Sequence, residues 1–149
     1  MKQTRTELDL HADTSCFGSD CTIVSEDLSQ TAVVTPFLAS FGKVESVPIC
    51  TVAVAYDDLE NYTTYILIFH QVLYFKDLRH NLLCPNQLRL NGVTVNECPL
   101  MHTRKRDLNE ESHSIVVAED NLLIPLQLDG VISYFITRKP THDELNFPE

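Results

Sequence analysis

Three residues that can act as acids, bases or metal ligands lie close together near the start of the chain: Asp9, His11 and Asp13, in the stretch ELDLHADTSCFG. Two carboxyl groups a few ångströms apart share one proton, so such a pair can both take and give a proton. Alternate residues of a strand point to one face, so the same three side chains could also bind a metal ion. A third interpretation is an ordinary acidic turn, with His11 hydrogen-bonded locally.

Cysteines offer a further metal-site interpretation. Cys16 and Cys21 with His11 would supply three ligands, but the gap between the cysteines is loose and no fourth ligand lies nearby. The five cysteines of the chain are odd in number and include no CxxC pair, which predicts reduced, mostly buried thiols. We therefore expect neither a metal site nor another cofactor.

The length, charge and apolar runs of the sequence restrict the partners that the chain can bind. With 149 residues, the chain is long enough for one domain and an appendage. Its 11 Lys and Arg stand against 21 Asp and Glu, a formal charge of -10 that repels nucleic acid. The one dense basic stretch, residues 102–106, is followed by acids and is interpreted as a solvated loop. No apolar run approaches the ~20 residues needed to cross a bilayer, so we expect no membrane contact and a cytoplasmic location.

The elements that must position these residues are mostly strands. Short runs of β-branched and aromatic residues are separated by turn residues, which is typical of an all-β domain. Residues 57–62 are polar enough to close a long hairpin, and Asp129-Gly130 favours a two-residue turn. The predicted strands cover residues 22–24, 31–36, 47–56, 63–75, 93–95, 114–117, 122–128 and 131–137.

One stretch departs from the β pattern. Residues 80–92 read HNLLCPNQLRLNG, where Pro85 suits the first position of a helix and Gly92 the position just beyond its end. A single helix of about two turns is therefore expected here. The polar and acidic tail from Pro140 is expected to be loosely held.

Two segments of the sequence resemble the retropepsin-like aspartic proteases of copia-type retrotransposons. LDLHAD, residues 8–13, is similar to the active-site loop of that family, hydrophobic-Asp-(Ser/Thr)-Gly-Ala. QVLYFKDLRHNLLCPNQLRLNGVTV, residues 71–95, is similar to the family pattern that leads into its short helix, and it is the more specific of the two. The resemblance implies a retropepsin-like barrel over residues 1–98. Residues 99–149 would form an extension with a loop, a β-hairpin and the acidic tail.

The resemblance also implies the site residues. Asp9 takes the catalytic position, within an active-site loop made of Leu10, His11, Ala12, Asp13 and Thr14. A flap that closes over bound peptide is implied for residues 35–47. Its tip lies at Ser40, Phe41 and Gly42.

The chemistry implied by the family requires two aspartates, because one carboxylate activates water while the other protonates the carbonyl oxygen. This chain offers one such loop, so the resemblance implies a homodimer with one Asp9 from each subunit. Residues 93–98 are a candidate for pairing between the subunits. The expected substrate is a peptide or polyprotein, cleaved in the cytoplasm or within virus-like particles.

Departures from the family loop leave alternatives open. Leu10 stands where the family has a Ser or Thr hydroxyl, and His11 stands where it has Gly. A catalytically degenerate, dimeric peptide-binding module is therefore the alternative function. In a different register of the match to the family loop, Asp13, followed by Thr14, is the catalytic acid in place of Asp9. Asp9 then has no catalytic role.

Overall fold

The computed structural model describes residues 2–9, 13–34, 42, 44–96 and 113–146. It is mostly β-sheet with two short α-helices, which confirms the all-β prediction. Five of the predicted site residues fall outside the described residues: Leu10, His11, Ala12, Ser40 and Phe41.

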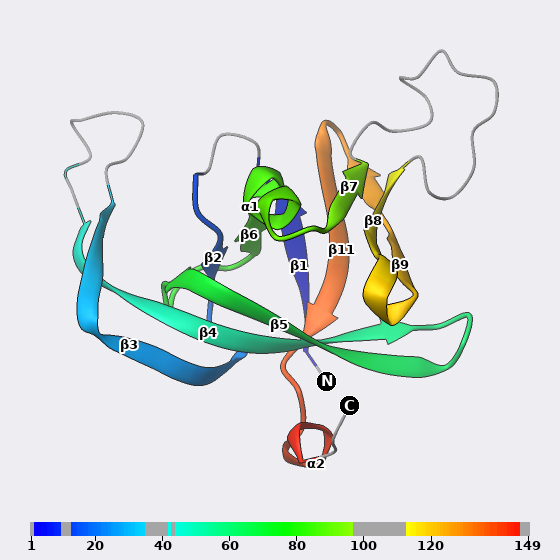
Figure 1. Cartoon of the computed structure of the whole chain (residues 1–149), viewed down its shortest axis with the longest axis horizontal. Helices are drawn as coiled ribbons and strands as arrows, with labels where there is room; N and C mark the ends of the chain where they lie inside the picture. Colours follow the sequence, from blue (N-terminus) through cyan, green and yellow to red (C-terminus); the bar gives the residue numbers. More distant parts are fainter. Residues whose placement is uncertain (1, 10–12, 35–41, 43, 97–112, 147–149) are drawn as a thin grey trace.

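The described strands form two sheets (Figure 1). The larger has the order β10-β11-β1-β6-β2-β5-β4-β3, and the smaller has the order β7-β8-β9. Figure 1 shows the long strands β4 and β5 crossing the molecule beneath helix α1, with β3 at one side and the small sheet at the other. The bounds of the larger sheet are β1 (Gln3–Leu8), β2 (Cys16–Phe17), β3 (Thr22–Val34), β4 (Val44–Asp58), β5 (Thr63–Tyr74), β6 (Asn81–Leu83), β10 (Gln127–Asp129) and β11 (Ile132–Arg138). Those of the smaller are β7 (Thr94–Asn96), β8 (Ser114–Val117) and β9 (Leu122–Pro125).

The longest hairpin is the one predicted from the polar residues 57–62. Strands β4 and β5 pair antiparallel from Ile49 opposite Leu73 to Asp58 opposite Thr63. Both strands are rich in β-branched and aromatic residues, which pack well on a pleated surface. The predicted run at 22–24 and residues 31–34 of the run at 31–36 instead belong to one strand, β3, whose register against β4 shifts three times. Residues 35 and 36 lie outside the described residues.

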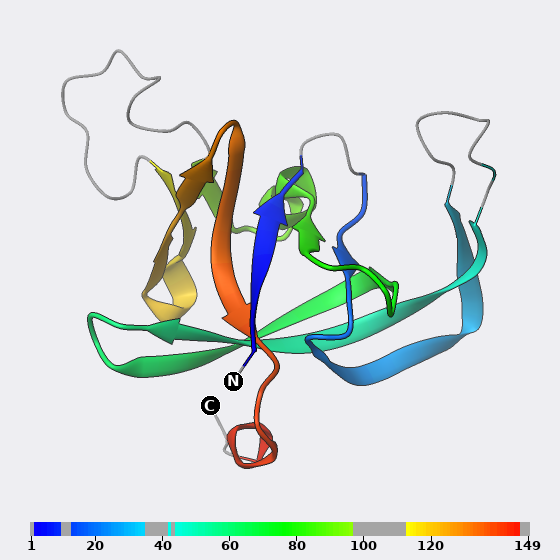
Figure 2. The ribbon, with the colours of Figure 1, turned by 180° about the vertical axis from the view of Figure 1, so that it is seen from behind.

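Strand β1 lies between the last strand of the chain and β6. It pairs antiparallel with β11, from Gln3 opposite Arg138, and parallel with β6, up to Leu8 opposite Leu83. Seen from behind, β1 and β11 run side by side (Figure 2). Strands β10 and β11, a hairpin within the predicted extension 99–149, therefore belong to the same sheet as β1.

The turn between β10 and β11 lies one residue later than predicted. Asp129 pairs with Ile132, so the two turn residues are Gly130 and Val131 and not Asp129 and Gly130. Only Gly130 has a positive φ, of 63°. Glycine at the first central position is what a type II′ hairpin turn requires.

Helix α1 (Pro85–Leu90) is the predicted short helix. Pro85 occupies its first turn, and Gly92 follows its end with a φ of 84°. Leu83, just before the helix, is buried in the core, whereas Leu90 is 88% exposed. None of the helices in the described part of the chain has the length and apolar character that crossing a membrane requires.

The tail from Pro140 is more firmly held than the sequence analysis expected. Residues His142–Leu145 form helix α2, which begins with a capping box between Thr141 and Glu144. The Thr141 hydroxyl accepts a hydrogen bond from the Glu144 amide at 3.2 Å, and the Glu144 carboxylate accepts one from the Thr141 amide at 2.8 Å. Reciprocal bonds of this kind satisfy amides that a helix start leaves unpaired.

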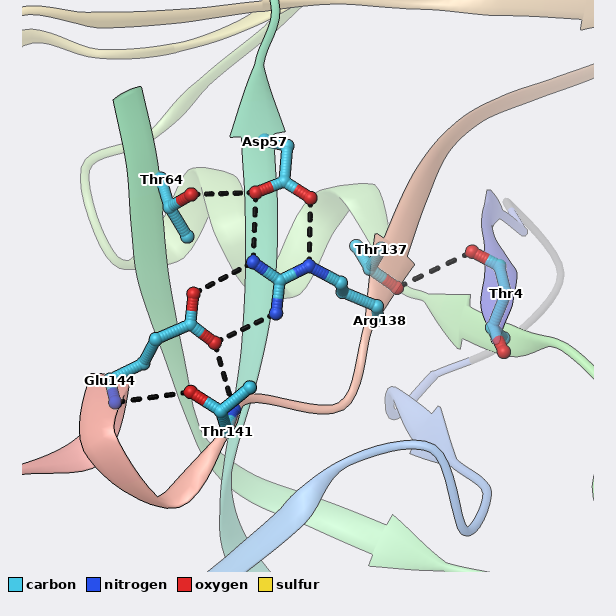
Figure 3. Close-up of polar contacts among 7 residues, drawn as sticks. All are labelled: Thr4, Asp57, Thr64, Thr137, Arg138, Thr141 and Glu144. Carbon is cyan, nitrogen blue, oxygen red and sulfur yellow. Dashed lines mark hydrogen bonds and ion pairs between the residues drawn. The ribbon is translucent and has the colours of Figure 1, made fainter. Parts of the chain in front are cut away.

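Arg138, at the end of β11, ties this tail to the β4–β5 hairpin (Figure 3). Its guanidinium donates two hydrogen bonds to Asp57, at 2.8 and 2.9 Å, and two to Glu144, both at 2.7 Å. Asp57 also accepts a bond from Thr64 at 2.6 Å. Hydrogen bonding to Arg138 lowers the pKa of Asp57 and lowers that of Glu144 to about 2. We call Asp57, Arg138 and Glu144 the arginine clasp.

The core fills the space between the two sheets and beneath α1. Phe17 of β2 and Phe69 of β5 have ring centroids 5.0 Å apart, and Phe135 of β11 packs edge-on against Tyr56. Polar residues in this core are paired: Thr6 and Thr137 share a hydrogen bond of 2.8 Å between β1 and β11. The core therefore contains side chains from distant parts of the chain. They include Val52, Val54, Leu83, Ile115, Ile124 and Phe135.

Candidate functional site

Asp9 immediately follows the last residue of β1, at the point where the neighbouring strand β6 leads into α1. Its backbone amide donates a hydrogen bond of 2.9 Å to the carbonyl of Leu83. Because β1 and β6 run parallel, both strands end at the same edge of the sheet, beside the start of the helix. Asp9 is half-buried, so its carboxylate lies on a fixed backbone but near the surface.

Asp13 and Asp9 both lie near enough to the Cys16 thiol for their negative charges to act on it, although the residues between them are outside the described ranges. Burial, followed by these two charges, raises the pKa of Cys16 to about 11. The two acids that the sequence singled out are therefore brought to the same region of the molecule.

Two residues that the sequence analysis did not select, Ser15 and Gln87, hold the end of this loop. The Ser15 hydroxyl accepts a hydrogen bond of 2.9 Å from the amide of Cys84, directly before α1. The Gln87 side chain accepts one of 2.9 Å from the Ser15 amide and donates one of 3.3 Å to the carbonyl of Gln71 in β5. Residues 15, 71 and 87 are far apart in sequence, so spacing alone gives no signal for this contact.

Replacing Gln87 with Leu is expected to loosen the loop after Asp13. The substitution leaves the Ser15 amide without its acceptor, and such a loss costs about 1–2 kcal/mol of unfolding free energy. Hydrogen exchange should show faster exchange of the Ser15 amide, with little change in β4. Gln87→Glu is the matched control, because a carboxylate can still accept the bond from Ser15. Equal exchange in the Leu variant and the wild type would contradict this role.

A groove of about 840 Å³ opens beside the second part of the loop. Asp13 and Thr14 line it at one side, and β3 lines it at the other. Its remaining walls come from Cys16 of β2, from β4 and β5, and from Gln87 of α1. The described charged residues along it are all acidic: Asp13, Glu26 and Asp27.

A second cavity, of about 530 Å³, lies between β5, α1 and the small sheet. Neither Asp9 nor Asp13 lines it. Its walls are mainly apolar and include Phe69, Leu88, Val93, Ile115 and Leu122.

The metal-site interpretations find no support among the residues that the structure describes. These contain no group of three His, Cys, Asp or Glu side chains placed to hold one ion. His11, which both interpretations needed, is outside the described ranges. The Cys21 thiol donates a hydrogen bond of 3.2 Å to the carbonyl of Gly18, and burial raises its pKa to about 11. The four described cysteines are free thiols, as predicted: Cys16, Cys21, Cys50 and Cys84.

Strand β7, which covers part of the segment expected to pair between subunits, is engaged within its own chain. It pairs antiparallel with β8, from Thr94 opposite Val116 to Asn96 opposite Ser114. The carbonyl of Val95 accepts a hydrogen bond of 2.9 Å from the Arg89 guanidinium of α1. A subunit contact through this strand would compete with the Arg89 bond. Gly42, at the expected flap tip, is exposed and has a φ of 74°.

Comparison of the chain with protein-family models, curated proteins and solved structures found no match. The functional argument therefore depends on the residues and their arrangement in this structure.

Proposed function

We propose that the chain is one subunit of a homodimeric aspartic endopeptidase, with Asp9 as its catalytic residue. The observation that carries the proposal is the position of Asp9. It follows a strand that runs parallel to β6, and its amide is bonded to Leu83 just before a short helix. A carboxylate-bearing residue whose backbone is hydrogen-bonded at a sheet edge supports the proposal, because a two-fold symmetric dyad would need one such residue from each subunit.

The proposed mechanism uses two copies of Asp9. One carboxylate takes a proton from a water molecule, and the resulting hydroxide attacks the peptide carbonyl. The other carboxyl group, protonated at the start, donates its proton to the carbonyl oxygen. In this mechanism the two carboxyl groups share one proton between them. No cofactor takes part in this mechanism.

Asp13 and Thr14 have a supporting role in this proposal. Both line the groove beside the loop, where a peptide in extended conformation would lie between the loop and β3. Hydrogen bonds from such a peptide to strand edges would resemble those of an added β-strand. In the other register Asp13 is itself the catalytic acid. Separate Asn substitutions at Asp9 and at Asp13 distinguish the two registers.

The second candidate function is a dimeric peptide-binding module that has the same groove but lacks the reaction. Leu10 and His11 favour it, because neither side chain matches the hydroxyl and the glycine of the family loop. Retention of Asp9 and Ala12 in the sequence favours the enzyme.

The experiment that separates these functions is digestion of a mixed peptide library by the purified chain at pH ~5. The enzyme proposal predicts new peptide termini at internal bonds, in equal amounts with and without a chelator. Loss of cleavage with the chelator would indicate a metal-dependent reaction. Absence of cleavage together with peptide binding would favour the binding module.

A further inference from the structure

Among the described residues, those that line the groove beside the candidate loop include no Lys or Arg. Strands β3, β4 and β5, which form most of its walls, contain no Lys or Arg anywhere along their lengths. Glu26 and Asp27 of β3 line one side of the groove, and Asp13 lines the other. A ligand in the groove therefore meets carboxylates on both sides.

Hydrogen bonds from Ser29 stabilise the negative charge of Asp27. One oxygen of the Asp27 carboxylate accepts hydrogen bonds from the amide of Ser29, at 2.9 Å, and from its hydroxyl, at 2.6 Å. These bonds lower the pKa of Asp27, so its charge persists in mildly acidic solution. Glu26 lies opposite Cys50 of β4 in the pairing of the two strands, and burial together with the charge of Glu26 raises the pKa of the Cys50 thiol.

The shape of the groove suits an extended chain. Strand β3 is the last strand in the order of the larger sheet, so within the described residues its outer edge has no strand partner. Its pairing with β4 is irregular between Glu26 and Thr31, and two successive acids at the start of this stretch, Glu26 and Asp27, line the groove. In an extended peptide alternate side chains point to the same side, so every second residue would face these acids.

Charge selects the occupant among the extended chains that could bind. A second copy of this chain pairing through β3 would bring Glu26 and Asp27 toward their own counterparts, and the chain carries a formal charge of -10. Acidic polymers would be repelled in the same way. Lys and Arg side chains would be attracted by all three acids of the groove.

We propose that the groove between β3 and the loop at Asp13 binds extended peptides with Lys or Arg side chains. This inference rests on the proposed function, since it assigns the substrate class of the same site. The basic side chains lie against Glu26 and Asp27, while the backbone of the peptide runs along β3.

The test measures binding of labelled short peptides that carry Lys, Gln or Glu at every second position. The Asp9→Asn variant is used, so that no peptide is cleaved during the measurement. Two exposed charge pairs predict about fivefold to tenfold tighter binding of the Lys peptide than of the Gln peptide. The Glu peptide should bind most weakly, and added salt should reduce the Lys preference.

Two double variants, each made in the Asp9→Asn background, show whether the preference for the Lys peptide depends on the acids of the groove. Glu26→Gln with Asp27→Asn should reduce the Lys preference to less than about twofold. Glu60→Gln with Glu119→Gln removes two exposed charges outside the groove and should leave the preference unchanged. The inference is overturned if no peptide binds, if the Gln or Glu peptide binds as tightly as the Lys peptide, or if the groove variant retains the preference.

The outcomes also separate this inference from the proposed function. Lys-dependent binding to the groove without cleavage by the wild-type chain would retain the inference and reject the enzyme. Cleavage of peptides without regard to their charge would retain the enzyme and reject the inference.

Discussion

Replacing Asp9 with Asn is expected to reduce kcat/KM for peptide cleavage by about 10²–10⁴, the usual contribution of a general acid or base. The Asn amide cannot act as a general acid or base at pH ~5, so each active site would lose both its acid and its base. The amide of residue 9 would still donate to the Leu83 carbonyl, because that bond involves only the backbone. We therefore expect the contact between β1 and β6 to persist while activity is lost.

The matched control is Asp13→Asn, which changes the other acid of the same loop. Asp13 is exposed and lines the groove, so its loss should raise KM and leave kcat within a few-fold of the wild type. The opposite pattern, with full activity in the Asp9 variant and none in the Asp13 variant, would assign catalysis to the other register. Equal turnover by all three proteins would reject the dyad.

Replacing Arg138 with Met is expected to lower the free energy of unfolding by about 2–4 kcal/mol. Removal of one partner of a buried ion pair costs about 3–5 kcal/mol. The loss of unfolding free energy expected for Arg138→Met is smaller, because the side chains of Asp57 and Glu144 are 36% and 24% exposed and water screens their charges. The substitution would leave both carboxylates close together without a cation. Urea unfolding monitored by circular dichroism measures the change.

Arg138→Lys serves as the control, since it keeps the charge but loses the planar fork that binds two carboxylates at once. It should recover about half of the lost stability. Hydrogen exchange should place the loss in α2 and at the joined ends of β4 and β11. A Met variant as stable as the wild type would show that the arginine clasp does not hold the tail.

The arginine clasp also predicts a dependence of stability on pH. The pKa values of Asp57 and Glu144 are lower in the folded chain than in the unfolded chain, so both groups bind protons more weakly when folded. Their stabilising contribution is therefore complete above the unfolded pKa values near 4 and is lost as the pH falls toward 2. The Arg138→Met variant should lose less stability over this range than the wild type.

Local sequence patterns predicted the first helix and strands such as β4, β5, β8 and β11, because those elements depend on short-range preferences. β-branched runs on either side of residues 57–62 are sufficient for the hairpin of β4 and β5. Pro85 and Gly92 delimit α1 because one lacks an amide proton and the other tolerates a positive φ. Helix α2 also had a local signal, the Thr141 to Glu144 capping box, and the sequence analysis missed it.

Pairing between distant segments could not be predicted in the same way. Gln3 lies opposite Arg138, and no local preference of either residue indicates that contact. The bonds of Gln87 with Ser15 and Gln71 depend on how α1 packs against the strands, which a single sequence does not reveal. For the candidate site, residue types indicated the two acids, whereas the groove and its charge required the fold.

The most direct test of the central claim is a mixing experiment with wild-type chain and the Asp9→Asn variant, exchanged at constant total concentration. If each active site takes one Asp9 from each of two chains, mixed dimers are inactive and activity falls as the square of the wild-type fraction. An equal mixture should then retain roughly one quarter of the wild-type activity. Retention of roughly one half, in proportion to the wild-type chain present, would show that each chain works alone and would contradict the account.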